Sequence, residues 1–398
     1  MLAADIPIHK LENSTLKQFL EKWTKQSTPA PVTLRSSYVK TLYENKLDFI
    51  RKSVGEKSIW ISIDETTDIV GRYVAHTIVG TLDTSESTSF LLHAECLEKT
   101  NGSTIAQVFM NSLSILWPES IHHERVLLFT TNAAAYMLKA GSALKVLFPR
   151  MMHVTCATHG LHRVAEEVRS LFVDVDKLVA NGKKIFLKSA ARCTVFREMA
   201  SDKPLPPQPV LTRWGSWIVA AVYYAEHFDV FASVVDALDG SDAMSIRIVQ
   251  ELSKKTSLQA DLAFIRAHFG SLPAAIEKLE KQGRTLTEST SILSEVLEDL
   301  RRTPGNTGKK VRAKIDSVLS RNPTYRDLEQ IANVLRGRPN PDADQMYSPG
   351  ELASFRYAPI TSVDVERSFS TLKHVLNDRR LNFTFESLKQ ILVVNCNQ

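Results

Sequence analysis

One change of hydrophobic period, between residues 50 and 58, constrains the fold of this chain more than any other feature. Up to Ile50 the apolar residues recur at helical spacing, whereas Ser58–Ile63 alternates and is rich in β-branched residues, which predicts a strand. Two further strand-like segments, 73–82 and 89–97, follow after short turns. Three consecutive strands joined by tight turns indicate an antiparallel meander.

Beyond residue 100, helical and strand-like segments alternate. The predicted strands there are short and largely apolar, as the centre of a sheet accepts. The segments are helices 104–116, 133–148 and 159–172 and strands 125–129 and 153–156. The resulting order, β-β-β-α-β-α-β-α, is that of the ribonuclease H-like fold. We therefore predict an α/β protein with a ribonuclease H-like core on a mixed five-stranded sheet.

A proline-rich linker, Pro204–Pro209, precedes a region of different character. Residues 213–335 contain no convincing strand, and long amphipathic helices dominate. The predicted helices are 214–235, 243–269, 272–282 and 286–302, with basic loops at 301–310 and 336–342, and helices 362–375 and 385–394 close the chain. We divide the chain into an N-terminal helical segment (1–50), the first part of the core (51–203), a large helical insertion (204–350) and a C-terminal segment that completes the core (351–398).

The composition argues against several classes of protein. The 398 residues are 43% hydrophobic and 23% charged, which is ordinary for a globular protein. No apolar run approaches the roughly 20 residues of a membrane helix, and the first residues lack the pattern of a secretory signal. The four cysteines show no framework spacing, so we expect a reducing compartment. The net charge of +5 favours a nucleic-acid partner only slightly.

Asp64 is the first candidate for chemistry. It follows the predicted strand Ser58–Ile63, at the edge where ligands gather in open sheets. In a ribonuclease H-like sheet the strand 125–129 would lie beside it. Phosphoryl transfer at that place needs two or three carboxylates, which hold two metal ions roughly 3.5–4 Å apart. The residues that follow the strand 125–129 are Thr130, Thr131 and Asn132, and none of them is an acid.

Five segments resemble, in the same order, motifs of the hAT superfamily of DNA transposases. Ile63–Asp68 resembles the motif of the first catalytic aspartate, and Phe129–Met137 resembles the Thr-Asp-Asn-Ala segment that carries the second. The other three are Cys156–His159, similar to a Cys-x-x-His motif, Thr212–Ser216, similar to an Arg-Trp motif, and Ser362–Ser370, similar to a Glu-Arg-x-Phe-Ser helix. Their common order across residues 58–398 makes the resemblance specific.

The resemblance implies a catalytic triad that has lost one member. It maps the three acids of the family onto Asp64, Thr131 and Glu366, so that a threonine replaces the second acid. The ancestral reaction is DNA strand cleavage and transfer with Mg²⁺ or Mn²⁺, and Asp64 and Glu366 would still bind such an ion weakly. We therefore expect an inactive or domesticated protein. The alternatives are an active transposase with a different second acid, and a degenerate copy without a role.

The resemblance also implies partners. In active relatives the tryptophan of the Arg-Trp motif stacks on a flipped base, so we expect DNA contacts from Arg213, Trp214 and His159. Residues 357–398 resemble the dimerisation region of the family. Residues 2–50 resemble the stretch that follows the zinc finger of CGG-triplet-repeat-binding proteins, and we expect this finger to be missing. We expect a nuclear protein that binds DNA and that can form a homodimer through residues 357–398. We expect no association with a membrane and no small-molecule substrate.

Several of these residues also have a structural interpretation. Asp68 and Glu124 are the nearby acids that could replace the missing one, although we expect Asp68 to be solvated. Glu366 could form salt bridges in its helix, and Trp214 could anchor the insertion. The last two helices carry apolar stripes that could form a dimer or close the core: Phe369, Leu372, Leu376, Leu388, Ile391 and Leu392.

The row His153-x-x-Cys156-x-x-His159-x-x-His162 invites a zinc site, because cysteine and neutral histidine are zinc ligands. Its three-residue spacing crosses a predicted strand-to-helix junction, which points the early and late members in different directions. We favour a core position for Cys156 and a capping or orienting role for His159.

Overall fold

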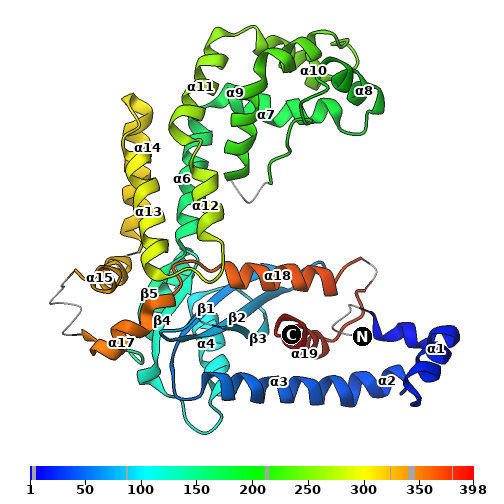
Figure 1. Ribbon diagram of the computed structural model, residues 1–398, viewed down its shortest axis with the longest axis vertical. Coiled ribbons are helices and arrows are strands. Elements are labelled where there is room, and N and C mark those ends of the chain that lie inside the picture. Colours follow the sequence, from blue (N-terminus) through cyan, green and yellow to red (C-terminus); the bar gives the residue numbers. More distant parts are fainter. Residues whose placement is uncertain (2–5, 87, 211–214, 323, 339–345, 379) are drawn as a thin grey trace. The chain divides into compact units, whose positions relative to one another are not determined.

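The computed structural model describes residues 1, 6–86, 88–210, 215–322, 324–338, 346–378 and 380–398 (Figure 1). The chain forms two compact units. Unit 1 comprises Met1–Cys156, Gly283–Thr287 and Asn322–Gln398, and unit 2 comprises Ala157–Gln282 and Glu288–Arg321. Compared with the division that we predict from the sequence, residues 157–203 therefore group with the helical unit, and the chain returns to the sheet-bearing unit at residue 322.

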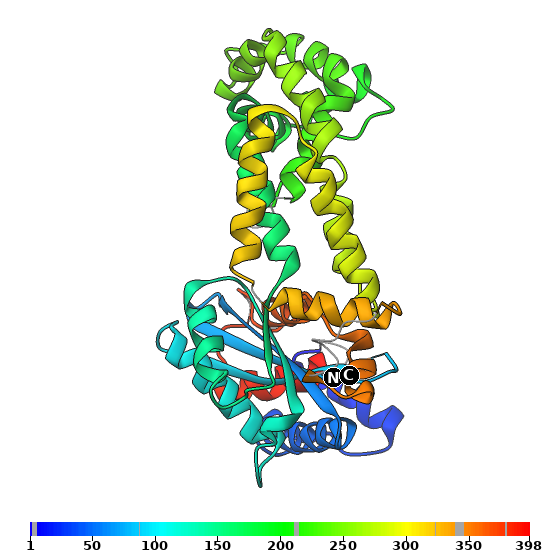
Figure 2. The same ribbon diagram turned by 90° about the vertical axis from the view of Figure 1, so that its left-hand side faces the viewer.

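Unit 1 is built on one mixed five-stranded sheet in the order β3-β2-β1-β4-β5. Figure 2 shows strands of this sheet as blue and cyan arrows. Its strands are β1 (Ser58–Thr67), β2 (Tyr73–Leu82), β3 (Ser89–Leu97), β4 (Val126–Thr131) and β5 (Met152–Thr155). β1, β2 and β3 pair antiparallel, whereas β4 pairs parallel to β1 and to β5. The five predicted strands and the α/β class are confirmed, and β1 and β4 are adjacent and parallel as predicted. β1 is longer than predicted, because it continues past Ile63 through Asp64 to Thr67.

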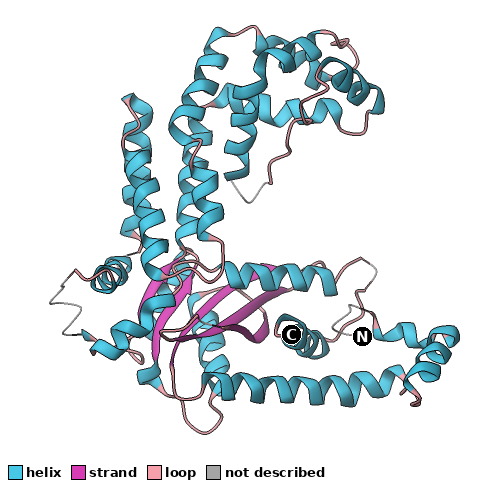
Figure 3. Ribbon diagram, in the orientation of Figure 1, coloured by secondary structure: helices cyan, strands magenta, loops and turns pink. Residues whose placement is uncertain are grey.

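Two helical layers cover the two faces of this sheet (Figure 3). α18 (Val363–Val375) lies on one face, where Oγ of Ser368 is 2.7 Å from Nδ1 of His76. α4 (Gly102–Leu116) lies on the other, where Oγ of Ser112 is 2.9 Å from Oγ1 of Thr77. Consecutive strand residues point to opposite faces. On β1, Asp64 pairs with His76 and therefore faces α18, whereas Ile63 pairs with Thr77 and faces α4.

Aromatic packing fills the face under α4. The ring of Phe129 on β4 lies 5.0 Å from that of Phe109 on α4, which in turn lies 5.2 Å from that of Phe148. All three side chains are fully buried. Burial of each contributes about 1.5–3 kcal/mol. α5 (Ala135–Leu144) packs against α4.

One asparagine pairs with each edge strand of the sheet. Asn397 accepts the backbone N–H of Leu91 on β3 (2.9 Å) and donates to its carbonyl oxygen (2.8 Å). Asn322 does the same for Thr155 on β5, at 3.1 and 2.9 Å. An open edge leaves backbone donors and acceptors unpaired. At one position on each edge, an amide side chain supplies the two bonds that a further strand would make.

The remaining helices of unit 1 are short or lie at its ends. They are α1 (Ser14–Thr24), α2 (Pro31–Thr33), α3 (Val39–Val54), α15 (Tyr325–Leu335), α17 (Pro349–Ser354) and α19 (Phe385–Cys396), with η2 (Ile8–Glu12), η3 (Leu34–Tyr38), η4 (His123–Arg125) and η5 (Phe355–Tyr357). α19 packs against β3 and α3. The stripe residues of the last two helices, Phe369 excepted, are at most 6% exposed, so they serve the core of this chain.

Unit 2 contains helices joined by loops, and no strand lies among its described residues. Its helices are α6 (Ala157–Leu171), α7 (Val173–Phe186), α8 (Ala190–Met199), α9 (Gly215–Asp236), α10 (Met244–Ser253), α11 (Thr256–Phe269), α12 (Leu272–Leu279), α13 (Leu286–Arg301) and α14 (Gly305–Ser320). Two predictions were wrong. The predicted helix 243–269 is broken because Lys255 has extended backbone angles. The basic segment 301–310 is not a loop, because α14 begins at Gly305 and contains both lysines.

α9 is the one described helix that is long and apolar enough to cross a membrane by length and composition. From the sequence we expect no apolar run close to the length of a membrane helix, and by these two criteria α9 is an exception. Half of its most apolar window is buried inside the chain, and the core helix of a soluble protein has the same character. Its Trp217 donates a hydrogen bond from Nε1 to Oδ1 of Asp176 on α7 (3.0 Å), within unit 2.

Candidate functional site

Asp64 lies on β1 and faces the layer of α18. Its Cα partner on β2 is His76, and its exposed fraction is 6%. Its Oδ1 accepts hydrogen bonds from the backbone N–H of Glu65 (2.9 Å) and from Nδ2 of Asn132 (2.8 Å). A buried carboxylate is stable only where it receives such donors. The structure therefore provides Asp64 with one donor from β1 and one from the residue that follows β4.

Asn132 follows β4, and a second hydrogen bond fixes the orientation of its amide. Its Oδ1 accepts the backbone N–H of Ala134 at 2.8 Å, so the NH₂ group is the end that faces Asp64. β1 and β4 run parallel with Ser62 opposite Thr130, and continuing this register puts Asn132 opposite Asp64. The neighbour of Asp64 across these strands is therefore a hydrogen-bond donor.

Thr131 points away from Asp64, to the face under α4. Its hydroxyl donates to the carbonyl oxygen of Asn132 (2.8 Å) and lies 2.9 Å from Nε2 of His153 on β5. The ring of His153 stacks on Phe129, with ring centroids 5.0 Å apart. Burial lowers the pKa of His153 to about 4, so the ring is neutral. Because the threonine hydroxyl donates its hydrogen to Asn132, the tautomer that fits this contact carries its hydrogen on Nε2. Sequence motifs pair Thr131 with Asp64, whereas the alternation of β4 separates their side chains.

Glu65 is an acid that our reasoning from the sequence missed. Its Oε1 accepts a hydrogen bond from the hydroxyl of Tyr136 on α5, and its Oε2 is buried without a hydrogen-bond partner in the described part of the chain. Burial raises the pKa of Glu65. Because it is adjacent to Asp64 on one strand, it points to the opposite face. An acidic pair directly after the apolar segment 58–63 was the available signal.

Glu366 lies half-buried in the first turn of α18. This helix packs on β1 and β2, the strands of Asp64 and His76. Ser368 holds it there through its hydrogen bond with His76, and the ring centroid of Phe369 lies 5.0 Å from that of His76. The structure thus brings the helix of Glu366 onto the strands that carry Asp64 and its partner.

The two alternative acids do not lie beside Asp64. Asp68 is not solvated as predicted, because its side chain is 1% exposed and its Oδ2 lies 2.7 Å from Nε of Arg72. Its Oδ1 accepts two backbone N–H groups of the β1–β2 turn, which it stabilises. Glu124 precedes β4 at the end where that strand pairs with Ile59, so the length of the strand separates it from Asp64.

The members of the row 153–162 have separate partners. Cys156 is a core residue, as predicted, and its Sγ accepts the backbone N–H of Ser362 at 3.2 Å. In unit 2, Nδ1 of His162 accepts the backbone N–H of Gly215 at 3.3 Å. Among the residues that the structure describes, no group of three or more His, Cys, Asp or Glu side chains is arranged to hold a metal ion.

The predicted DNA contacts lie partly outside the described residues. Arg213 and Trp214 are not described, and neither is most of the basic segment 336–342. His159 is half-buried on α6 of unit 2. The lysines of 309–310 are exposed on α14, on a helix rather than on the predicted loop.

One family of known proteins matches part of this chain. Residues 30–185 match the family described as Domain of unknown function (DUF659). DUF659 is found in hAT-like transposase-derived proteins. The DUF659 match covers all five strands and includes Asp64, Asn132 and Thr131, whereas Glu366 lies beyond it. No curated protein matches the chain.

Proposed function

We propose that this chain derives from a hAT-superfamily DNA transposase, has lost strand cleavage, and acts as a DNA-binding nuclear protein. The DUF659 match supports this origin. So does the strand order β3-β2-β1-β4-β5, with β1 parallel to β4, because this order is that of a ribonuclease H-like core. The net charge of +5 is compatible with a DNA partner.

The loss of cleavage rests on one observation, the amide of Asn132 beside Asp64. A two-metal site needs a second carboxylate there. The NH₂ group of Asn132 instead points its donors at Asp64, and its oxygen is already bound to Ala134. Such donors occupy the carboxylate and repel a cation, so the residues present do not fit a two-metal centre. We expect Mg²⁺ and Mn²⁺ to bind weakly at Asp64 and Glu366.

Asn132→Asp tests this proposal directly. The substitution replaces the donor by a carboxylate next to Asp64, so Mn²⁺ affinity should rise at least about tenfold, or 1.4 kcal/mol, in a calorimetric titration. Thr131→Asp is the matched control, because it adds the same charge on the face under α4. We expect it to leave Mn²⁺ affinity unchanged and to cost roughly 1–3 kcal/mol of stability, since it buries a carboxylate beside His153.

The unmodified chain and its Asp64 variant distinguish an inactive DNA-binding protein from an active transposase. The unmodified chain should bind a DNA duplex in a fluorescence anisotropy titration and should not nick supercoiled DNA with Mn²⁺. Nicking that Asp64→Ala abolishes would refute the loss of activity and establish an active transposase. If Asn132→Asp and Asp64→Ala both leave Mn²⁺ affinity unchanged, the assignment of the ancestral site is wrong. Failure to bind the duplex at low salt would contradict the DNA-binding role.

A further inference from the structure

A cavity of about 470 Å³ lies in unit 1, and no residue of the sheet lines it. One wall comes from the N-terminal arm, which includes η2, Arg35 of η3 and the first residue of α3. The other comes from the end of α18, the connection 380–384 and one side of α19. Two segments more than three hundred residues apart in sequence thus enclose one space, separate from Asp64.

The floor of this cavity is aliphatic. Ile8, Val39 and Ile391 line it, and each is at most 9% exposed. Leu381 also lines it but is 42% exposed, so it lies near the opening. The volume falls within the range of sites that enclose small organic molecules, about 300–1,000 Å³. The walls therefore suit an aliphatic body of moderate length.

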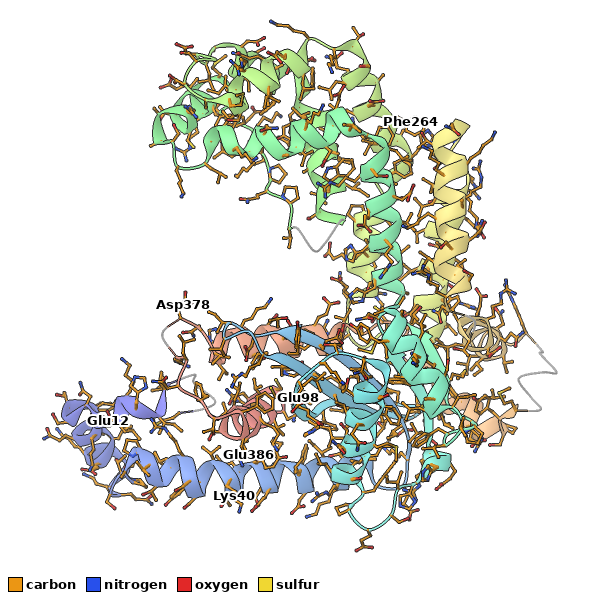
Figure 4. All side chains as sticks on the ribbon, turned by 180° about the vertical axis from the view of Figure 1, so that it is seen from behind. Glu12, Lys40, Glu98, Phe264, Asp378 and Glu386 are labelled. Carbon is orange, nitrogen blue, oxygen red and sulfur yellow. The ribbon has the colours of Figure 1, made fainter. Side chains whose placement is uncertain are left out.

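The charged groups of the lining are all basic. Arg35 and Arg380 line the cavity together with His9, and no aspartate or glutamate does. Figure 4 labels carboxylates on neighbouring segments, Glu12, Asp378 and Glu386, but none of them belongs to the lining. Glu386 forms an ion pair with Lys389, at 2.6 Å. Two guanidinium groups at one apolar cavity favour an anionic group on the ligand.

We propose that this cavity binds a small amphiphilic anion, a medium-chain alkyl carboxylate. The alkyl chain would pack on Ile8, Val39 and Ile391, and the carboxylate would meet Arg35 and Arg380. A guanidinium presents paired N–H donors that match the two oxygens of a carboxylate. The site is independent of the transposase origin, because it shares no residue with the Asp64 site.

Decanoate is the probe, titrated calorimetrically into the full chain below its micelle concentration. We expect saturable binding at one site, and no such binding of decyltrimethylammonium, which has a matched chain and the opposite charge. Arg35→Gln removes one exposed cation and should weaken decanoate binding about tenfold. Leu381→Glu puts a carboxylate at the opening and should weaken it at least as much.

Lys40→Gln is the matched control. Lys40 is exposed on α3, next to Val39, but does not line the cavity and pairs with Glu44 at 3.9 Å (Figure 4). Its loss should change decanoate affinity by less than about twofold, since an exposed ion pair contributes little. Equal binding of the two detergents, or an equal effect of Lys40→Gln and Arg35→Gln, would overturn the proposal. Thermal unfolding of each variant separates lost binding from lost structure.

Discussion

Thr131 and Asn132 are neighbours in sequence that serve opposite faces of the sheet. The side chain of Thr131 lies on His153 under α4, and that of Asn132 lies on Asp64. Which residue meets Asp64 depends on the register of β4 against β1 and on the place where β4 ends. A motif aligned by residue type does not contain this information. At the scale of single residues, the chemistry of the candidate site is therefore set by a one-residue alternation.

Two buried histidines make stability depend on pH. Burial lowers the pKa of His153 to about 4 and that of His76 to about 3, from 6.5. The unfolded chain therefore takes up protons first, so stability is full above pH 6.5 and is lost as the pH falls towards 4. For His153 alone the loss should approach roughly 3 kcal/mol. Urea unfolding at several pH values measures it, and His153→Gln should reduce the slope. A flat profile between pH 6.5 and 4 would be incompatible with a neutral buried ring.

At the scale of elements, the edge strands are controlled from far along the chain. Asn322 and Asn397 stand well after the strands that they bind, β5 and β3. Both asparagines are buried, and each satisfies the N–H and C=O of one edge residue. The sheet thus needs the return of the chain at residue 322 and its C-terminal end, and not only its five strands.

Asn322→Ala and Asn397→Ala should each destabilise the protein. Each substitution leaves a buried backbone donor and acceptor without their side-chain partner, which costs about 1–3 kcal/mol. Asn181→Ala is the matched control, because Asn181 makes one exposed hydrogen bond, to the carbonyl oxygen of Lys177 on its own helix. Its effect on the free energy of unfolding in urea should stay below about 0.5 kcal/mol. If Asn322→Ala and Asn397→Ala have the same free energy of unfolding as this control, the asparagine bonds to the edge strands contribute nothing to stability.

At the scale of the whole molecule, unit 2 is inserted into the sequence of unit 1. The backbone of Thr155 is hydrogen-bonded to the side chain of Asn322, so the points of departure and return in unit 1 are adjacent. Within unit 2, Gly160 near the start of α6 packs against Val318 near the end of α14. Each unit thus closes on itself, as an inserted domain does.

Residues 157–321 should therefore be replaceable by a short glycine–serine linker. We expect the excised protein to retain the five-stranded sheet and a cooperative thermal transition, visible by circular dichroism. The transition should occur at a lower temperature than in the full chain, because Gly283–Thr287 belongs to unit 1 and is lost. Arg336 would then lose its hydrogen bond to the carbonyl oxygen of Thr287. A variant without a cooperative transition would show that unit 1 does not fold alone.

Dimerisation through residues 357–398 stays a prediction. Leu372 and Leu388, which belong to the predicted stripes, are buried within this chain, at 1% and 0% exposure. Large exposed apolar side chains instead occur on α1, where Phe19 and Trp23 are 57% and 68% exposed. Of the predicted stripe residues, only Phe369 is not buried in this chain, so a contact between copies through the C-terminal region would use Phe369 and residues outside the stripes.

The sequence by itself determined the five strands and their order along the chain. Strands 73–82 and 89–97 have the predicted bounds, because the turn residues that flank them are a local signal and need no partner. The helical character of residues 215–321 follows equally from spacing. Asp64 could be identified because it comes after the apolar segment 58–63, which is again a local signal.

Only the tertiary structure decided which groups meet. The contact of Asn132 with Asp64 depends on strand register, and the bonds of Asn322 and Asn397 to the edge strands depend on contacts between distant segments. Likewise the cavity at Arg35 exists because the N-terminal arm and the α18–α19 connection lie against each other. A local pattern specifies which face of an element is apolar, but not what covers that face. The chemistry of the site arises from that cover.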